Sequence, residues 1–143
     1  MKKIVIAIIT IVFVLTVVIG INIYSYQQRL KTISKNNKTY ESFYNVEVLG
    51  TDVASLINKI IDNNTKNNIK KDEKGKYIED NNENLILLNI KFLEIDDVIP
   101  IESLEKQGVD RFIKNFGAAT FKCTKIEYYE NTKGVKSLYF EEI

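Results

Sequence analysis

The sequence predicts an α+β protein: an N-terminal transmembrane helix that continues into an amphipathic stem, then a helix packed on a small antiparallel sheet of about three strands. Three observations lead to this class. An uncharged apolar run opens the chain, a stripe with helical spacing follows it, and three later stretches have the composition and alternation of strands. We therefore expect an N-terminal tail and transmembrane helix at 1–25, a helical stem at 26–47 and an α+β domain at 48–143.

The apolar run begins at Ile4, ends at Tyr24 and contains no charged residue. A helix needs about 20 such residues to cross a hydrocarbon core roughly 30 Å thick. The abundance of Ile, Val, Leu and Phe favours insertion without a partner. A cleaved secretory signal has a shorter apolar core, followed by a cleavage site marked by small residues. The run at 4–24 is longer than such a core, and no cleavage site of this kind follows it. The sequence therefore predicts an uncleaved signal anchor in the cell membrane.

The basic residues that flank the run predict its orientation. Lys2 and Lys3 precede it, and further basic residues follow it in the stem, so the two flanks conflict under the positive-inside rule. A short basic head before a long apolar run behaves like a signal sequence, and long following domains are translocated largely regardless of their charge. We expect the N-terminus inside the cell and the C-terminal domain outside the cytoplasm.

Beyond the run, apolar and aromatic residues recur at spacings of three and four, which predicts that the helix continues as an amphipathic stem. Two interpretations of this stem stripe stay open: a docking face for another protein, or the face that packs on the domain's own sheet. The segment 34–38 is too polar for a coiled-coil seam. Asn37 falls on the same stripe. The candidate interaction residues are Tyr26, Leu30, Ile33, Tyr40 and Tyr44.

Turn residues and periodicity divide the remaining chain into elements. Gly50 marks a break before a helix that extends to about Asn63, with Thr51 or Asp52 as the candidate cap. The polar tract that follows lacks the spacing of a calcium loop and is expected to be a solvated loop. The further elements expected are a strand at 85–95, a helical stretch that begins near 98–100, is interrupted at Gly108 and ends at Gly117, and two hairpin-linked strands at 120–129 and 135–142.

The composition offers no catalytic, cofactor or metal site. The chain has no His and one cysteine, Cys123, so the usual zinc ligands and the usual base of a nucleophilic triad are missing. Neighbouring carboxylates such as Asp96 and Asp97 point to opposite sides of an extended chain. Lys and Arg number 20 against 19 Asp and Glu, which is not the basic excess of a nucleic-acid binder. The sequence predicts a protein that is not an enzyme and has no nucleic-acid partner.

The layout of a basic N-terminus at Lys2 and Lys3, an apolar helix that becomes amphipathic, and a small antiparallel sheet resembles type IV pilins and minor pseudopilins. The segment 50–59, with 62–64, is similar to small single-pass membrane proteins of low-GC Gram-positive bacteria, some of them similar to Tad-type pilus proteins. The Gly and the Glu that mark processed pilins are absent at the start of the run. The resemblance implies a pilin-like tether, and the missing Gly and Glu predict that this tether is not processed.

The anchor and the resemblance lead to one expected function and one alternative. We expect a non-enzymatic envelope protein that acts in assembly or interaction, including as a pilin-like accessory subunit. Its expected partners are membrane lipid and other membrane or pilus-assembly proteins. The alternative is a membrane-tethered sensor or small-ligand-binding module with a pocket between the helix at 53–61 and the sheet.

Overall fold

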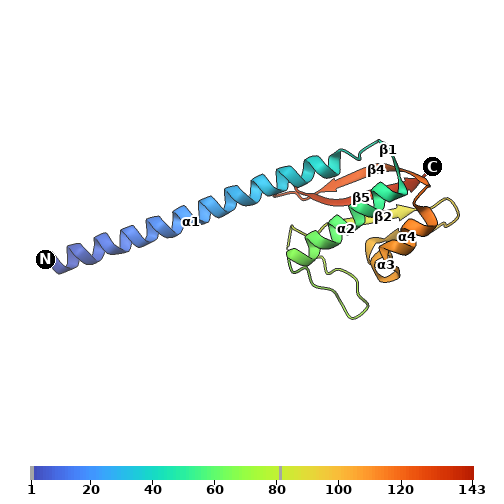
Figure 1. Cartoon of the computed structure of the whole chain (residues 1–143). Coiled ribbons are helices and arrows are strands. Elements are labelled where there is room, and N and C mark those ends of the chain that lie inside the picture. Colours follow the sequence, from blue (N-terminus) through green and yellow to red (C-terminus); the bar gives the residue numbers. More distant parts are fainter. Residues whose placement is uncertain (1, 81) are drawn as a thin grey trace.

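The computed structural model describes residues 2–80 and 82–143, and it has a long helix that projects from a small α+β domain (Figure 1). Helix α1 runs without a break over Lys2–Glu41. The predicted class is confirmed: an apolar helix continues as a stem and is followed by a helix and a sheet. The domain elements are, in order, β1 (Glu47–Leu49), α2 (Gly50–Lys66), β2 (Leu87–Lys91), β3 (Val98–Pro100), α3 (Ile101–Gln107), α4 (Val109–Phe116), β4 (Thr120–Tyr128) and β5 (Val135–Glu142).

The apolar half of α1 projects away from the domain, and its side chains are exposed. In the described chain, α1 is the one helix long and apolar enough to cross a membrane by length and composition. Its polar side chains, Thr10, Thr16 and Asn22, each donate a hydrogen bond to the carbonyl four residues earlier. These donors are therefore satisfied inside the helix, as a hydrocarbon environment requires.

The described residues form one mixed sheet of five strands in the order β1-β4-β5-β2-β3. The pair β2 and β5 is parallel, with Leu88 opposite Leu138 and Ile90 opposite Phe140, and the other pairs are antiparallel. The prediction of about three antiparallel strands was therefore wrong in the number of strands and in the direction of β2 relative to β5, whereas the predicted antiparallel pair of β4 and β5 is confirmed. β1 and β3 have only three residues each, too few for an alternating pattern, and local periodicity carries no information on a long-range parallel pairing.

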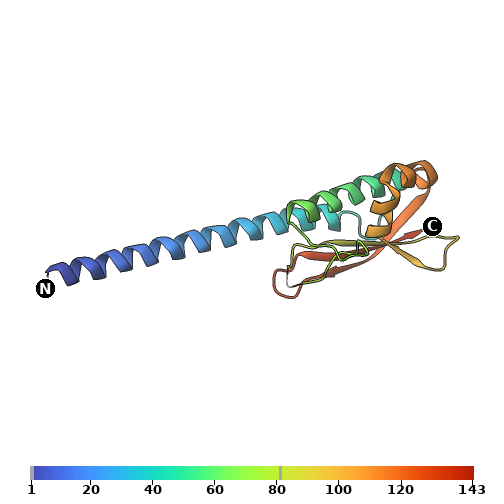
Figure 2. The ribbon, with the colours of Figure 1, turned by 90° about the horizontal axis from the view of Figure 1, so that it is seen from below.

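Helices cover one face of the sheet and leave the other open (Figure 2). The predicted apolar face of α2 is buried in this interface. Each such side chain contributes about 1.5–3 kcal/mol relative to exposure, so this helix-on-sheet interface supplies much of the domain's stability. The fully buried residues here include Val53, Ile57 and Ile60 of α2, and Leu88, Ile90, Phe121 and Leu138 of the strands.

The open face of the sheet is polar and balanced in charge. The strand register places Glu47 opposite Lys122, Lys122 opposite Glu141, and Glu141 opposite Lys91. Charges of opposite sign thus alternate across β1, β4, β5 and β2, an arrangement that favours the pairing of neighbouring strands.

The start of α2 differs from the sequence prediction. The helix begins at Gly50, and Leu49, which precedes it, provides no side-chain cap, so neither Thr51 nor Asp52 is the capping residue. A Cβ atom at Gly50 would lie 1.9 Å from the carbonyl oxygen of Phe116 at the end of α4. Glycine is required here because α2 and α4 approach closely, and local sequence gives no sign of that contact.

The alternation of buried and exposed side chains along β4 is interrupted at Thr124. The register shifts between Cys123 and Lys125, and Thr124 is exposed at this bulge. Phe121 and Cys123 occupy the buried positions instead, with 0% of their surface exposed. An irregularity of this kind adds one residue to a strand and changes which side chains face the core beyond it.

Asn64, near the end of α2, is a buried polar residue that holds the chain entering β2. Its Nδ2 donates to the carbonyl oxygen of Ile86 at 2.8 Å, and its Oδ1 accepts from the backbone N–H of Ile86 at 3.0 Å. The side chain is 0% exposed, so water has no access to replace either bond. Both backbone groups of Ile86 depend on this one carboxamide.

We therefore expect Asn64→Ala to lower the free energy of unfolding by about 2–3 kcal/mol, because two buried backbone groups lose their partner. Asn58→Ala is the matched control, since Asn58 is exposed on the same helix, and it is expected to change little. Thermal unfolding of the full chain in detergent micelles, followed by circular dichroism, measures both. Equal stability of the two variants would contradict the role assigned to Asn64.

Candidate functional site

The structure divides the five stripe residues predicted on the stem. Tyr26 is 58% exposed and Leu30 is 36% exposed, whereas Tyr40 is 1% exposed. Ile33 lies between these extremes and is half-buried. Tyr44 lies beyond the end of α1 and is 54% exposed. The five residues therefore do not form one continuous surface: Tyr26 and Leu30 are free, Ile33 and Tyr40 pack on the domain, and Tyr44 is exposed beyond the end of the helix.

Asn37 fixes the stem to the loop between β4 and β5. Its Nδ2 donates to the carbonyl oxygen of Lys133 at 2.7 Å, and its Oδ1 accepts from the backbone N–H of Val135 at 3.0 Å. Asn37 thus uses both ends of its carboxamide on segments distant in sequence. These two bonds set the position of α1 along β5.

The last residues of the stem complete the docking. α1 ends at Glu41, so the final part of the predicted stem forms turns and the start of β1. The Tyr128 hydroxyl donates to Oε1 of Glu41 at 3.1 Å. The Phe43 ring meets the Phe140 ring edge-on, with centroids 6.1 Å apart. Residues from Asn37 onward are therefore part of the domain rather than a linker.

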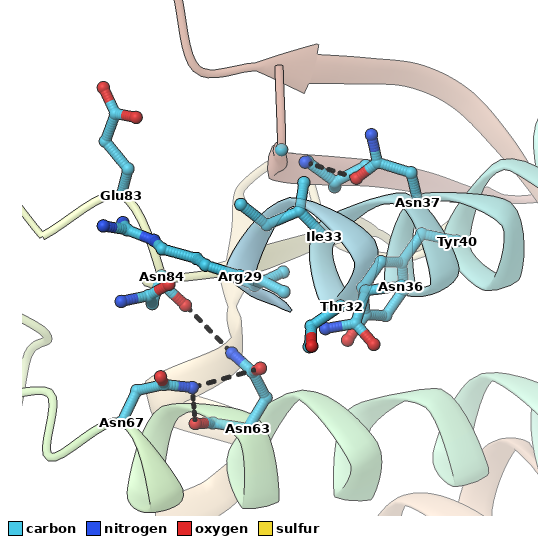
Figure 3. Close-up of a pocket in the computed structure, with 13 residues that line it drawn as sticks. Arg29, Thr32, Ile33, Asn36, Asn37, Tyr40, Asn63, Asn67, Glu83 and Asn84 are labelled. Carbon is cyan, nitrogen blue, oxygen red and sulfur yellow. Dashed lines mark hydrogen bonds between the residues drawn. The ribbon is translucent and has the colours of Figure 1, made fainter. Parts of the chain in front are cut away.

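A pocket of about 210 Å³ lies where the stem meets the C-terminal end of α2 (Figure 3). Thr32 and Asn36 on α1 face Asn63 on α2 and Asn67, which follows the end of α2, across it (Figure 3). Loop residues close its remaining sides. The apolar part of the lining comes from Ile33, Ile86 and Val135.

This pocket is not where the sequence placed one. The predicted pocket lay between the helix at 53–61 and the sheet, but side chains fill that space, and Val53, Ile57 and Ile60 are 0% exposed. The observed pocket lies at the C-terminal end of α2, beyond Ile60, the last of these core residues. Its walls form because α1 docks beside α2, an arrangement that the sequence analysis did not anticipate.

Some carboxamides of the pocket are used by the fold, and one is not. Nδ2 of Asn63 donates to the carbonyl oxygen of Asn84 at 2.9 Å, and Nδ2 of Asn67 donates to that of Asn63 at 2.8 Å. Asn36 makes no side-chain hydrogen bond with any other residue that the structure describes. A carboxamide both donates and accepts hydrogen bonds, so Asn36 offers both functions to the pocket.

Tyr40 has a buried ring and a hydroxyl that meets the pocket. The residue is 1% exposed, and burial raises the pKa of its hydroxyl to about 12. That hydroxyl makes no hydrogen bond within the described chain. Every fully buried side-chain polar atom there has a partner, so the hydroxyl oxygen itself is not fully buried. Because Tyr40 lines the pocket, the hydroxyl faces this space and remains a protonated donor near neutral pH.

Charged groups of both signs stand at the end of the pocket nearest the apolar half of α1, where Arg29 extends toward Glu83 (Figure 3). The Glu83 carboxylate accepts from Nδ2 of Asn131 at 2.7 Å and from the backbone N–H of Thr132 at 3.1 Å. Slight desolvation raises the pKa of Glu83, but these bonds and the charge of Arg29 outweigh it and hold the pKa below its usual value. The two charges offset each other, so the pocket is polar without a net charge.

Sequence reasoning did not single out Thr32, Asn36, Asn63 or Asn67 as a group. Each lies on the polar side or at the end of a helix, where side chains normally face water. The richness of both segments in Asn was the one visible signal. Their convergence depends on the docking of α1 against α2, which only the tertiary structure reveals.

No family model matches the chain, and neither a curated protein nor a solved structure matches it. Within residues 2–80 and 82–143, no three Asp, Glu or Cys side chains gather as a metal site would require.

We expect Asn37→Ala to lower the free energy of unfolding by about 1–2 kcal/mol, because the substitution leaves Lys133 O and Val135 N without their partner. Hydrogen exchange of the Val135 amide should also become faster in the folded protein. Asn36→Ala is the control from the adjacent position and should alter neither quantity. Unchanged exchange at Val135 in Asn37→Ala would show that another group holds the hairpin loop.

The pKa of Tyr40 predicts how stability depends on alkaline pH. Between pH 10 and about 12, the unfolded Tyr40 ionises while the folded one stays protonated. The folded state then binds more protons, so stability falls as pH rises through this window. The stability of Tyr40→Phe should fall less steeply in this pH window than the stability of the wild type. The pKa of Tyr129 is also raised to about 12, but Tyr129 contributes equally to both proteins. Identical slopes in unfolding experiments at these pH values would refute the assignment.

Proposed function

We propose that this chain is a non-enzymatic, single-pass membrane protein of the cell envelope that acts in assembly or interaction. The apolar half of α1 is the membrane span, and the α+β domain lies outside the cytoplasm. The stem below the domain contacts a second membrane protein. Membrane lipid surrounds the span itself.

The exposed lower part of the stem stripe is the observation that carries this proposal. Tyr26 and Leu30 lie on the same face of α1 as Ile33 and Tyr40, which the domain covers. They are 58% and 36% exposed, directly after the apolar run. An aromatic and an aliphatic side chain that continue a packed face without a partner suit a contact with another protein.

The arrangement of α1 supports a more specific form of this role, that of a pilin-like accessory subunit. The first half of the helix is free and apolar, and only its C-terminal end, from Ile33 onward, packs on the domain. A helix built in this way places its domain at a fixed height above the membrane and presents its free half to other membrane helices.

The pocket favours a second candidate function, a membrane-tethered sensor or small-ligand-binding module. It lies between the stem and the domain, and Asn36 and Tyr40 present polar groups to it that the fold does not use. Pockets that bind small molecules are few in any one protein. A ligand bound there would contact α1 directly, just above the proposed membrane span.

A photocrosslinking experiment in intact cells tests the assembly proposal. A photoreactive amino acid at Tyr26 or at Leu30 should give one discrete crosslinked species containing a second membrane protein, including a second copy of this chain. The same amino acid at Gln28, on the opposite face of α1, is the matched control and should give none. Crosslinks to lipid alone at all three positions, or equal protein crosslinks from Gln28, would overturn the proposed docking face.

A further inference from the structure

We propose that the pocket between the stem and α2 binds a single sugar ring, either as a free sugar or as the headgroup of a glycolipid. This inference extends the second candidate function by naming the chemistry of the ligand. It is independent of any protein partner at the exposed stem stripe.

The walls of the pocket match a neutral, hydroxyl-rich ligand. Thr32, Asn36, Asn63 and Asn67 line opposite sides of it (Figure 3). The unbonded carboxamide of Asn36 places a donor and an acceptor side by side, which complements two neighbouring hydroxyls on a sugar ring. The Nδ2 groups of Asn63 and Asn67 already donate to backbone carbonyls. The charges of Arg29 and Glu83 offset each other at one end, so neither an anion nor a cation is favoured as a whole.

Two polar groups in the pocket await a partner. The Tyr40 side chain is 1% exposed, and its hydroxyl makes no hydrogen bond within the described part of the chain. The hydroxyl oxygen is nevertheless not fully buried, because every fully buried side-chain polar atom of the described residues has a partner. The Asn36 carboxamide lies next to Tyr40 in Figure 3, and it too makes no hydrogen bond with another described residue. Both groups are therefore accessible from the pocket, where water bonds to them until a ligand takes its place. A ring hydroxyl lying between them would accept from Tyr40 and bond with Asn36.

The size of the pocket limits the ligand to one ring. Its volume of about 210 Å³ is smaller than the roughly 300–1,000 Å³ typical of sites for drug-sized molecules. The apolar side chains of Ile33, Ile86 and Val135 offer a surface for the C–H face of such a ring. An oligosaccharide would extend beyond these walls.

The position of the pocket allows both sources of the sugar. Arg29, at its end nearest the apolar run, follows Tyr24 by about 7.5 Å at 1.5 Å per helical residue. Lipid headgroups extend roughly 5–7.5 Å beyond the hydrocarbon core on each side. If the apolar run spans the membrane as proposed, that end of the pocket lies at the outer edge of the headgroup layer, within reach of a glycolipid as well as of a dissolved sugar.

Binding experiments on the full chain separate the two sources. In the first arm, the protein in detergent micelles is titrated with glucose, galactose and N-acetylglucosamine, and binding is followed by calorimetry and by the shift in unfolding temperature. In the second arm, the protein in phosphatidylcholine nanodiscs is compared with nanodiscs that also contain glucosyl diacylglycerol. We expect a stabilising shift in at least one arm, and the arm that responds identifies the source.

Three variants tie the binding to the pocket. Tyr40→Phe and Asn36→Leu should each weaken it about tenfold, which corresponds to about 1.4 kcal/mol, and neither substitution breaks a hydrogen bond of the fold. Tyr44→Phe removes a hydroxyl from an exposed tyrosine outside the pocket and should bind like the wild type. The proposal is overturned if the wild type responds in neither arm, or if Tyr40→Phe and Asn36→Leu bind as well as Tyr44→Phe. Crosslinking from Tyr26 does not involve the pocket, so the assembly proposal stands or fails separately.

Discussion

The two hydrogen bonds of Asn37 join the stem to the loop between β4 and β5, and much of the molecule depends on this contact. Backbone N–H and C=O groups near a packed surface need partners, so α1 has one favourable position along β5. In that position Tyr40 enters the core, and Phe43 packs edge-on against Phe140. The contact therefore makes the C-terminal end of α1, from Ile33 onward, a structural part of the domain, and it fixes where the apolar half points.

The pocket follows from the same docking, and the loop before β2 supplies its third side. Asn64 holds Ile86 through both backbone groups, and the Tyr129 hydroxyl donates to the carbonyl oxygen of Leu85 at 2.8 Å. Further along this loop, the Tyr77 hydroxyl donates to Glu105 of α3 at 3.1 Å. The walls are therefore held by the fold before any ligand arrives, which favours binding because little order has to be gained.

Helix and hairpin periodicities predicted the local elements well, and long-range contacts account for the errors. α2, β4 and β5 lie close to where alternation and i, i+3, i+4 spacing placed them. β1 and β3 were missed because three residues carry no pattern, and β3 occupies 98–100, where a lead into the helix was expected. The parallel pairing of β2 with β5 joins strands separated by two helices and two other strands. In the candidate site, Tyr40 was identified as a stripe residue, whereas its hydroxyl became relevant only once α2 lay beside it.

Local patterns in the sequence were enough to predict that a long apolar helix leads into an amphipathic one, and that an α+β domain with an apolar helix face follows. These features depend on the order of residues along one segment, where side chains three or four positions apart share a face. The tertiary structure alone decided that the stem stripe is covered at Tyr40 and open at Tyr26, and that carboxamides from two helices meet around one pocket. The reason is physical: those contacts join segments far apart in the chain, and their free energy exists only when the segments are packed together.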